Sequence, residues 1–185
     1  TPSSLWRGVP IESFPPLEED ISTEVTVVGS GIAGITTAYR LVQSGFKVTL
    51  VEAGRVLEGT TGYTTAKISA QHGLIYQQLQ KTIGDEKAEL YYKANMAALQ
   101  AIEKNMEDLQ IDCDFSYQDA IVYGETEKAK KLIEKEAEIY EKLEIDGEIT
   151  NDTALPFPVS GAIKMHHQAQ FHPVKYLLPL IDYLK

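Results

Sequence analysis

The sequence predicts an α/β fold that opens with a βαβ unit, and three observations predict it. A run of β-branched residues at 25–28 has the character of a short strand buried on both faces. A glycine-rich turn follows at once, Gly29-Ser30-Gly31-Ile32-Ala33-Gly34. After a helical stretch, a second β-branched run at 48–51 ends in the acidic residue Glu52. Strand, turn, helix, strand and acid therefore follow the order of a Rossmann-type nucleotide-binding unit.

Each glycine of the turn has a mechanical role in such a unit. Gly29 lets the chain leave the strand sharply, Gly31 lets the backbone approach a pyrophosphate, and Gly34 lets the helix pack tightly. The unpaired N–H groups and the positive dipole end of the helix then point at the phosphates. Glu52 can accept hydrogen bonds from ribose hydroxyls, and its charge would repel a 2′-phosphate. The turn predicts binding of a dinucleotide that lacks this phosphate.

Length and composition limit the size of the core and the kinds of partner that the protein can have. The 185 residues, 43% of them hydrophobic, suffice for one core with at most a small appended lobe. A net charge of -10 argues against nucleic acid or an anionic membrane as a partner, because both would repel it. A single cysteine, Cys113, excludes an internal disulfide framework and a cysteine metal cluster. Without a membrane-length apolar run or a secretion signal in this sequence, we expect a cytoplasmic protein.

The sequence on both sides of the βαβ unit indicates further loops and helices in the first half of the chain. Residues 1–22 predict an irregular arm, because four prolines interrupt any regular pattern, and we expect Trp6 to pin this arm to the body. Residues 54–66 are rich in Gly and Thr and predict a loop. The spacing of apolar residues predicts a short helix at 76–82 and a long one at 84–109.

The pattern then changes to mixed strand and helix signals. Residues 115–123 predict two strands on either side of a Gln118-Asp119 turn. Residues 126–143 predict a charged amphipathic helix, with Thr126 as its N-cap.

The end of the chain predicts one more strand and one more helix. The strand is expected at 161–171, and His172-Pro173 then opens the helix, because proline suits a first helical turn. The chain stops inside this helix, at Lys185. A doubly wound sheet needs more strands than the first two. We therefore expect a fold that is incomplete at the C-terminus, as in an N-terminal fragment of a longer protein.

The turn with its flanks, residues 29–39, and the later Val51-Glu52-Ala53-Gly54 together resemble the opening of a known family. They are similar to V-I-G-x-G-I-x-G-x-x-x-A-x-x-L followed by V-x-E-x-G in FAD-dependent oxidoreductases of the D-amino-acid oxidase and glycine oxidase (DAO) type. The resemblance is close over residues 23–73 and looser beyond. A glutamate at this position is more typical of FAD enzymes than of NAD enzymes, so the resemblance implies FAD.

The next loop, residues 59–73, lies where the family carries a Ser-x-x-Asn-Ala-Gly segment that passes the pyrophosphate and reaches the flavin ring. Here Thr64-Thr65-Ala66 stand in place of Asn-Ala-Gly. This version resembles a subgroup whose full-length members carry a C-terminal Rieske [2Fe-2S] domain. The resemblance implies such a cluster only in a part of the protein that lies outside these 185 residues.

The resemblance also implies an organisation in four consecutive parts. We expect an irregular arm at 1–22 and the N-terminal part of an FAD-binding domain at 23–83. A helical and α+β portion of a substrate lobe is expected at 84–171. The start of a crossover helix back to the FAD domain is expected at 172–185. The fold class is thus α/β, with a Rossmann-like βαβ unit and part of a second, α+β lobe.

The resemblance implies that the turn, Glu52 after the second strand and the Gly- and Thr-rich loop at 54–66, called the threonine loop below, hold the cofactor together with Lys67. The residues expected there are Gly29, Ser30, Gly31, Ile32, Ala33, Gly34, Glu52, Ala53, Gly54, Thr60, Thr61, Thr64, Thr65 and Lys67. Lys67 and His72 are the ionisable residues on the flavin side of the loop. A cation there could stabilise a reduced anionic flavin by Coulomb attraction. The plainer interpretation is a surface lysine and a loop histidine.

Other reactive residue types favour structural roles. His166 and His167 would point to opposite faces of a strand, so a metal shared with His172 is not expected. Cys113 lies between two aspartates, with no cationic neighbour in sequence to lower its pKa, so a reactive thiolate is not expected. No catalytic acid, base or metal ligand is assigned.

We therefore expect an FAD-dependent oxidoreductase fragment that is inactive alone and holds flavin weakly or not at all. The intact enzyme would oxidise a C–N or C–O bond of a small substrate by hydride transfer. Its electrons would pass to an acceptor, for which the Rieske cluster is one candidate. One alternative is an NAD-binding dehydrogenase, and another is a truncated binding or assembly module without catalysis. An oligomeric state is not predicted.

Overall fold

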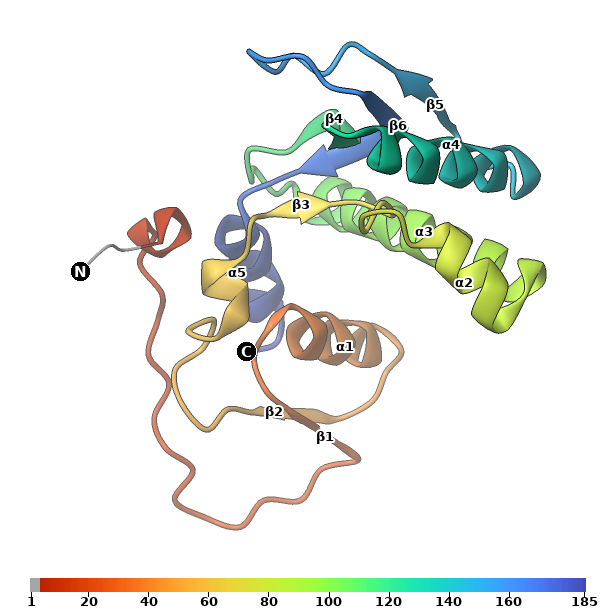
Figure 1. The fold of residues 1–185 in the computed structure, drawn as a ribbon. Helices are drawn as coiled ribbons and strands as arrows, with labels where there is room; N and C mark the ends of the chain where they lie inside the picture. Colours follow the sequence, from red (N-terminus) through yellow and green to blue (C-terminus); the bar gives the residue numbers. More distant parts are fainter. Residues whose placement is uncertain (1–3) are drawn as a thin grey trace. The chain divides into compact units, whose positions relative to one another are not determined.

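The computed structural model describes residues 4–185, which form two compact units (Figure 1). The first unit comprises residues 4–66, 105–115 and 171–185. The second comprises residues 67–104 and 116–170. These interleaved ranges differ from the four consecutive parts expected above, whose roles as cofactor domain and substrate lobe stay predictions.

The first unit is built around a parallel strand pair. β1 (Val25–Val28) and β2 (Val48–Val51) pair in register, Val25 opposite Val48. α1 (Ile32–Gln43) connects them and packs against α5 (Pro173–Tyr183). Two short 3₁₀ helices, η1 (Leu5–Gly8) and η2 (Thr60–Tyr63), complete the unit together with the last turn of α3. The predicted βαβ unit is confirmed.

The core of the first unit lies between its helices. Its most deeply buried side chains include Ile35, Ala38, Tyr39, Leu57, Val174, Tyr176, Leu177 and Leu180. The strand pair is less covered than the β-branched pattern predicts. Val28 is 81% exposed, so the expectation that β1 is buried on both faces is wrong. The physical reason is that this sheet has two strands within residues 4–185, and no further layer covers the outer face.

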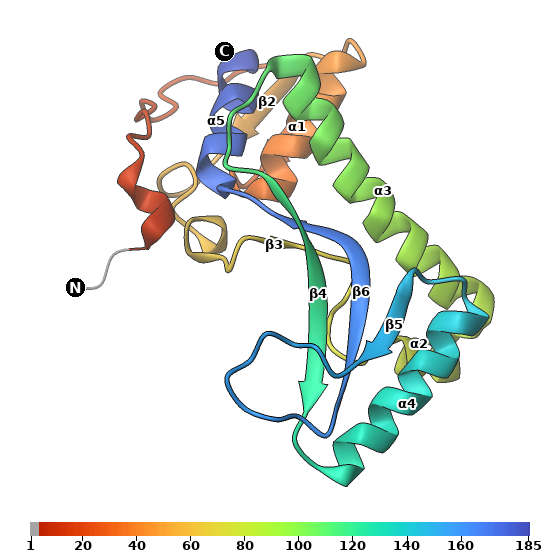
Figure 2. The same ribbon diagram turned by 90° about the horizontal axis from the view of Figure 1, so that it is seen from above.

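The second unit is an antiparallel sheet with three helices (Figure 2). β6 (Gly161–Gln170) is the central strand, and β3 (Lys67–Ile68), β4 (Ser116–Gly124) and β5 (Gly147–Thr150) all pair with it. The helices are α2 (Tyr76–Ile83), α4 (Glu127–Lys142) and all but the end of α3 (Asp85–Leu109). Thr126 caps α4 as predicted, because its side chain accepts from the Ala129 N–H.

Two expectations about these strands are wrong. The Gln118-Asp119 pair does not turn the chain, because β4 is one continuous strand with a bulge between Gln118 and Ala120. The bulge absorbs the polar pair and leaves Asp119 3.3 Å from the His166 ring. The short strands β3 and β5 were not predicted, since neither has enough residues to show an alternating pattern.

A buried carboxylate organises the core of the second unit. Glu136 on α4 is fully buried and accepts hydrogen bonds from the N–H groups of Tyr76 (2.7 Å) and Gln77 (2.9 Å). It thereby caps α2 from another helix, satisfying donors that a helix N-terminus leaves free. Burial raises its pKa above the ordinary value, although the two N–H groups oppose this shift.

No helix within residues 4–185 is long and apolar enough to span a membrane.

Candidate cofactor site

The glycine turn has the geometry that the sequence predicts. Gly29 has φ +98°, in the left-handed region, and its N–H donates to the Val51 carbonyl at 2.7 Å. A Cβ on Gly34 would lie 1.8 Å from the Gly29 carbonyl oxygen. Because no real Cβ tolerates such a distance, α1 can approach the turn only with glycine here. The turning role of Gly29 and the packing role of Gly34 are confirmed.

The start of α1 is contacted by the threonine loop. Gly31 is the N-cap residue and provides no side chain to cap the helix. The Ile32 N–H instead donates to the Thr61 hydroxyl oxygen at 3.0 Å. That hydroxyl accepts through a lone pair, so its own hydrogen stays available for an oxygen acceptor such as a phosphate. Ala33, in the first turn of α1, is exposed.

Glu52 is held at the end of β2 by three donors. Its Oε2 accepts from both the N–H and the hydroxyl of buried Ser30, each at 2.8 Å. Its Oε1 accepts from the Gly54 N–H at 2.9 Å. These bonds, the one from Gly54 first, lower the pKa of Glu52 to about 2. The carboxylate is therefore ionised at neutral pH, and its remaining lone pair can accept a hydroxyl hydrogen.

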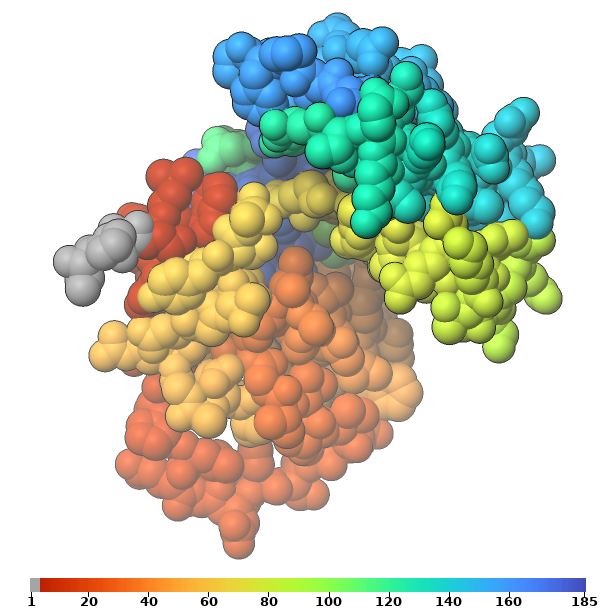
Figure 3. Space-filling model, viewed as in Figure 1, coloured from red at the N-terminus to blue at the C-terminus, as the bar shows by residue number. Residues whose placement is uncertain are grey.

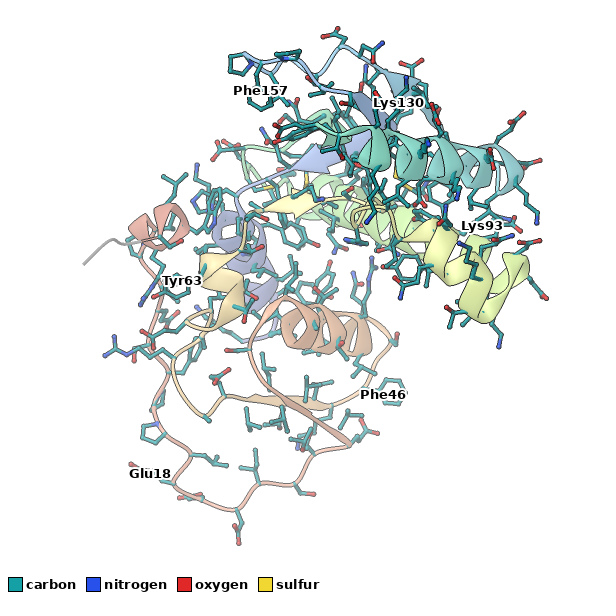
Figure 4. All side chains as sticks on the ribbon, viewed as in Figure 1. Glu18, Phe46, Tyr63, Lys93, Lys130 and Phe157 are labelled. Carbon is teal, nitrogen blue, oxygen red and sulfur yellow. The ribbon has the colours of Figure 1, made fainter. Side chains whose placement is uncertain are left out.

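The threonine loop is tied to the N-terminal arm. The Trp6 ring N–H donates to the Thr64 carbonyl at 2.6 Å, so the prediction that Trp6 pins the arm is confirmed. Arg7 forms an ion pair with Glu58 at 2.8 Å and also bonds to the hydroxyl of Tyr63, which Figure 4 labels. The loop that contacts the start of α1 is thus braced from outside.

The remaining threonines and the residue that replaces the family glycine lie in the same loop. Thr60 and Thr65 are exposed, and the Thr64 hydroxyl accepts from the Ala66 N–H at 3.3 Å. Ala66 has φ +62°, in the left-handed region that favours glycine. The backbone there keeps a glycine-type conformation although the residue is alanine.

Lys67 and His72 belong to the second unit, so their distance to the turn is not defined. Lys67 donates from its ammonium group to the Gln71 carbonyl at 2.9 Å. The His72 ring lies 3.5 Å from the Asn95 side-chain oxygen and packs edge-on to Tyr91. Both side chains have local partners, and a role beside the flavin ring stays a prediction.

The three histidines near the chain's end occupy separate settings. His166 faces Asp119, His167 lies 3.5 Å from Asp146, and the His172 ring caps α5 by accepting from the Lys175 N–H. Within residues 4–185 there is no group of three or more His, Cys, Asp or Glu side chains that could hold a metal ion.

Cys113 is a buried thiol in the first unit. Burial, and then the charges of Asp112 and Asp114, raises its pKa to about 11. Lys175 is a cationic neighbour that the sequence did not reveal, and its charge lowers the pKa by less than burial raises it. The thiol is therefore protonated at neutral pH, and the expectation that it is unreactive agrees with this environment.

A cavity of about 1180 Å³ lies next to Glu52 in the first unit. Ser30, Glu52 and Gly54 line one side of it, and residues of the N-terminal arm line the other. The arm, in red in the space-filling view of Figure 3, runs along the surface of this unit. Sequence reasoning missed the arm as part of this site. The only signal was the apolar residues among its prolines, which do not by themselves indicate a ligand site.

Comparisons with known proteins agree with this geometry. A family model described as FAD dependent oxidoreductase (DAO) matches residues 24–185. YhfW of Bacillus subtilis, which is named as a Rieske 2Fe-2S iron-sulfur protein, is 43% identical over 182 residues, 98% of this chain and 36% of that protein. Gamma-glutamylputrescine oxidoreductase of Escherichia coli is 24% identical over 93% of this chain and 42% of that protein. The chain thus spans less than half the length of these relatives.

Solved structures share the fold. Glycine oxidase from Bacillus cereus superimposes with a TM-score of 0.63 at 14% sequence identity. The match covers 88% of this chain and 44% of that one. Most of this chain therefore has the fold of the corresponding part of that structure.

A substitution at Gly34 tests the packing of the turn. Gly34→Ala places a methyl group on the Gly29 carbonyl, so the chain must shift at the start of α1, and we expect destabilisation by roughly 2 kcal/mol or more. Gly59→Ala is the matched control, because a Cβ there meets nothing within 4 Å. Urea unfolding measures both variants. Equal midpoints would contradict the close approach of helix and turn.

Acid titration tests the hydrogen bonds to Glu52. The folded-state pKa of about 2 lies below the ordinary value of 4.5, so these bonds stabilise the fold above about pH 4.5. The stabilisation is lost as the pH falls towards 2. The difference in unfolding free energy between wild type and Glu52→Gln should therefore shrink as the solution is acidified. Ser30→Ala should give an intermediate curve, and a difference independent of pH would contradict the assignment.

Proposed function

Because the chain belongs to the FAD-dependent oxidoreductase family, we propose that its βαβ turn holds the adenosine diphosphate part of FAD. One observation carries the proposal: the ionised Glu52 carboxylate is fixed beside the start of α1 by bonds to Ser30 and Gly54. In this proposal, Glu52 would accept hydrogen bonds from the ribose, and the start of α1 beside it would bind the phosphates. We further propose that the whole protein oxidises a C–N or C–O bond of a small substrate.

The residues present fit the adenosine diphosphate part of this cofactor. The backbone of 29–34 and the N–H groups at the start of α1 would bind the pyrophosphate, and Gly31, which carries no Cβ, would let it approach closely. Glu52, with Ala53 and Gly54 beside it, would hold the ribose. Thr60, Thr61, Thr64 and Thr65 would line the phosphate and the path towards the ring, and Lys67 would lie on the ring side.

The flavin supplies the electron-accepting chemistry, and the residues of this chain bind and orient it. Hydride loss from a carbon next to nitrogen or oxygen suits the relatives, two of which are named as a glycine oxidase and a gamma-glutamylputrescine oxidoreductase. The name of the Bacillus subtilis relative supports a Rieske [2Fe-2S] cluster, outside these residues, as electron acceptor. The single cysteine, which forms no internal disulfide, supports a cytoplasmic location.

The two alternatives differ in what the purified protein contains. An NAD-binding dehydrogenase would have the same glycine turn but would belong to another family. A module without cofactor would have the same fold, but its Glu52 would bind no ribose. The family assignment favours FAD over NAD.

Cofactor analysis separates these functions. We expect the protein at its natural length to show flavin absorption bands and to release FAD on denaturation, identified by chromatography. Glu52→Ala should release less FAD per mole, because the ribose acceptor and the clamp on Ser30 are both lost. Glu18→Ala, at an exposed acid of the arm labelled in Figure 4, is the control and should keep the wild-type content. Bound nicotinamide, or no nucleotide at all, would contradict the proposal.

A further inference from the structure

The N-terminal arm encloses space next to the proposed ribose acceptor. The cavity of about 1180 Å³ is lined by arm residues 9–17 and, on the opposite side, by β2 and residues 52–56. Ser30 and Glu52 lie in its wall. All of these residues belong to the first unit, so one compact body forms the whole cavity. Its volume suffices for an adenosine group, since ligand pockets commonly measure about 300–1,000 Å³.

The arm is held at two places along its length. At one place, Trp6 and Arg7 bind the threonine loop through the Thr64 carbonyl and Glu58. At the other, Lys185 forms an ion pair with Glu12 and lies 5.7 Å from the centre of the Phe14 ring. The first anchor is on the loop that contacts the start of α1. The arm is thus attached to the same loop as the proposed phosphate site.

Between and beside these anchors the arm presents apolar side chains to the cavity. Those that line it are Val9, Pro10, Ile11, Phe14, Pro15, Pro16 and Leu17. Phe14 is 43% exposed and Leu17 64% exposed, so part of this apolar surface is uncovered. Neighbouring apolar side chains left exposed in a cavity wall are typical of a binding surface. The prolines restrict the backbone, which reduces the entropy lost when the arm is ordered on a ligand.

We propose that arm residues 9–17 form the outer wall of the adenosine end of the cofactor site. This inference rests on the proposed function, because it takes Glu52 as the ribose acceptor. An adenine base attached to that ribose has apolar faces and would lie in the cavity that Glu52 and the arm share. Ile11 is the residue we single out, because it is half-buried in the wall and is not an anchor of the arm.

The arm offers a matched pair of isoleucines for a test. Ile11 lines the cavity, whereas Ile21 is 52% exposed in the same arm and does not line it. Ile11→Asp and Ile21→Asp change the net charge equally. ADP, which carries the adenosine and both phosphates, is the probe, and its Kd is measured by calorimetry on the protein at its natural length after removal of bound flavin.

We expect Ile11→Asp to raise the Kd for ADP roughly tenfold and Ile21→Asp to leave it unchanged. Thermal unfolding without ligand should be the same for both variants, which separates binding from folding. ADP should also protect wild type from glutamyl endopeptidase cleavage at Glu12, and FMN, which lacks adenosine, should not.

The outcomes distinguish the two proposals. Equal ADP affinity in the two variants, or cleavage at Glu12 that ADP does not slow, would overturn the role of the arm while leaving the FAD proposal intact. Equal cleavage with and without ADP is also the result expected if another segment of the whole protein fills the cavity. A wild-type protein that binds neither FAD nor ADP would overturn the proposed function and the arm proposal with it.

Discussion

The contact between the Glu52 carboxylate and Ser30 is the interaction on which the site depends. It joins the end of β2 to the turn after β1 through two bonds to one oxygen, and the Gly54 N–H holds the other oxygen. Charge-assisted bonds of this kind are stronger than neutral ones. They fix the carboxylate relative to the first turn of α1. In the proposed site, this carboxylate would accept hydroxyl groups and the nearby N–H groups of α1 would donate to phosphate.

Glycine makes that arrangement possible in two different ways. Gly29 provides the left-handed backbone that carries the chain out of β1, and Gly34 leaves the space into which the Gly29 carbonyl projects. Both follow from local geometry, so the sequence alone was enough to predict them. The hydrogen bond from the Ile32 N–H to the Thr61 hydroxyl joins residues 29 positions apart, and no local sequence pattern predicts it. The same is true of the cavity wall formed by the arm.

The same distinction between local and long-range information applies to the elements of the fold. The helices α2, α3 and α4 have apolar spacing in their own sequences, and α4 also has its N-cap residue, Thr126; each helix lies within a residue or two of its predicted bounds. β3 exists only because Lys67 and Ile68 pair with the end of β6, about a hundred positions later. Residues 105–115 and 171–185 join the first unit by packing rather than by sequence neighbourhood. Periodicity does not reveal such interleaving.

The most direct test of the account is a crystal structure of the protein at its natural length with FAD or ADP bound. The account predicts the pyrophosphate at the first turn of α1, a ribose hydroxyl hydrogen-bonded to Glu52, and the Ser30 bonds to the same carboxylate retained. A nucleotide bound elsewhere, or a Glu52 side chain turned away from the ribose, would contradict it.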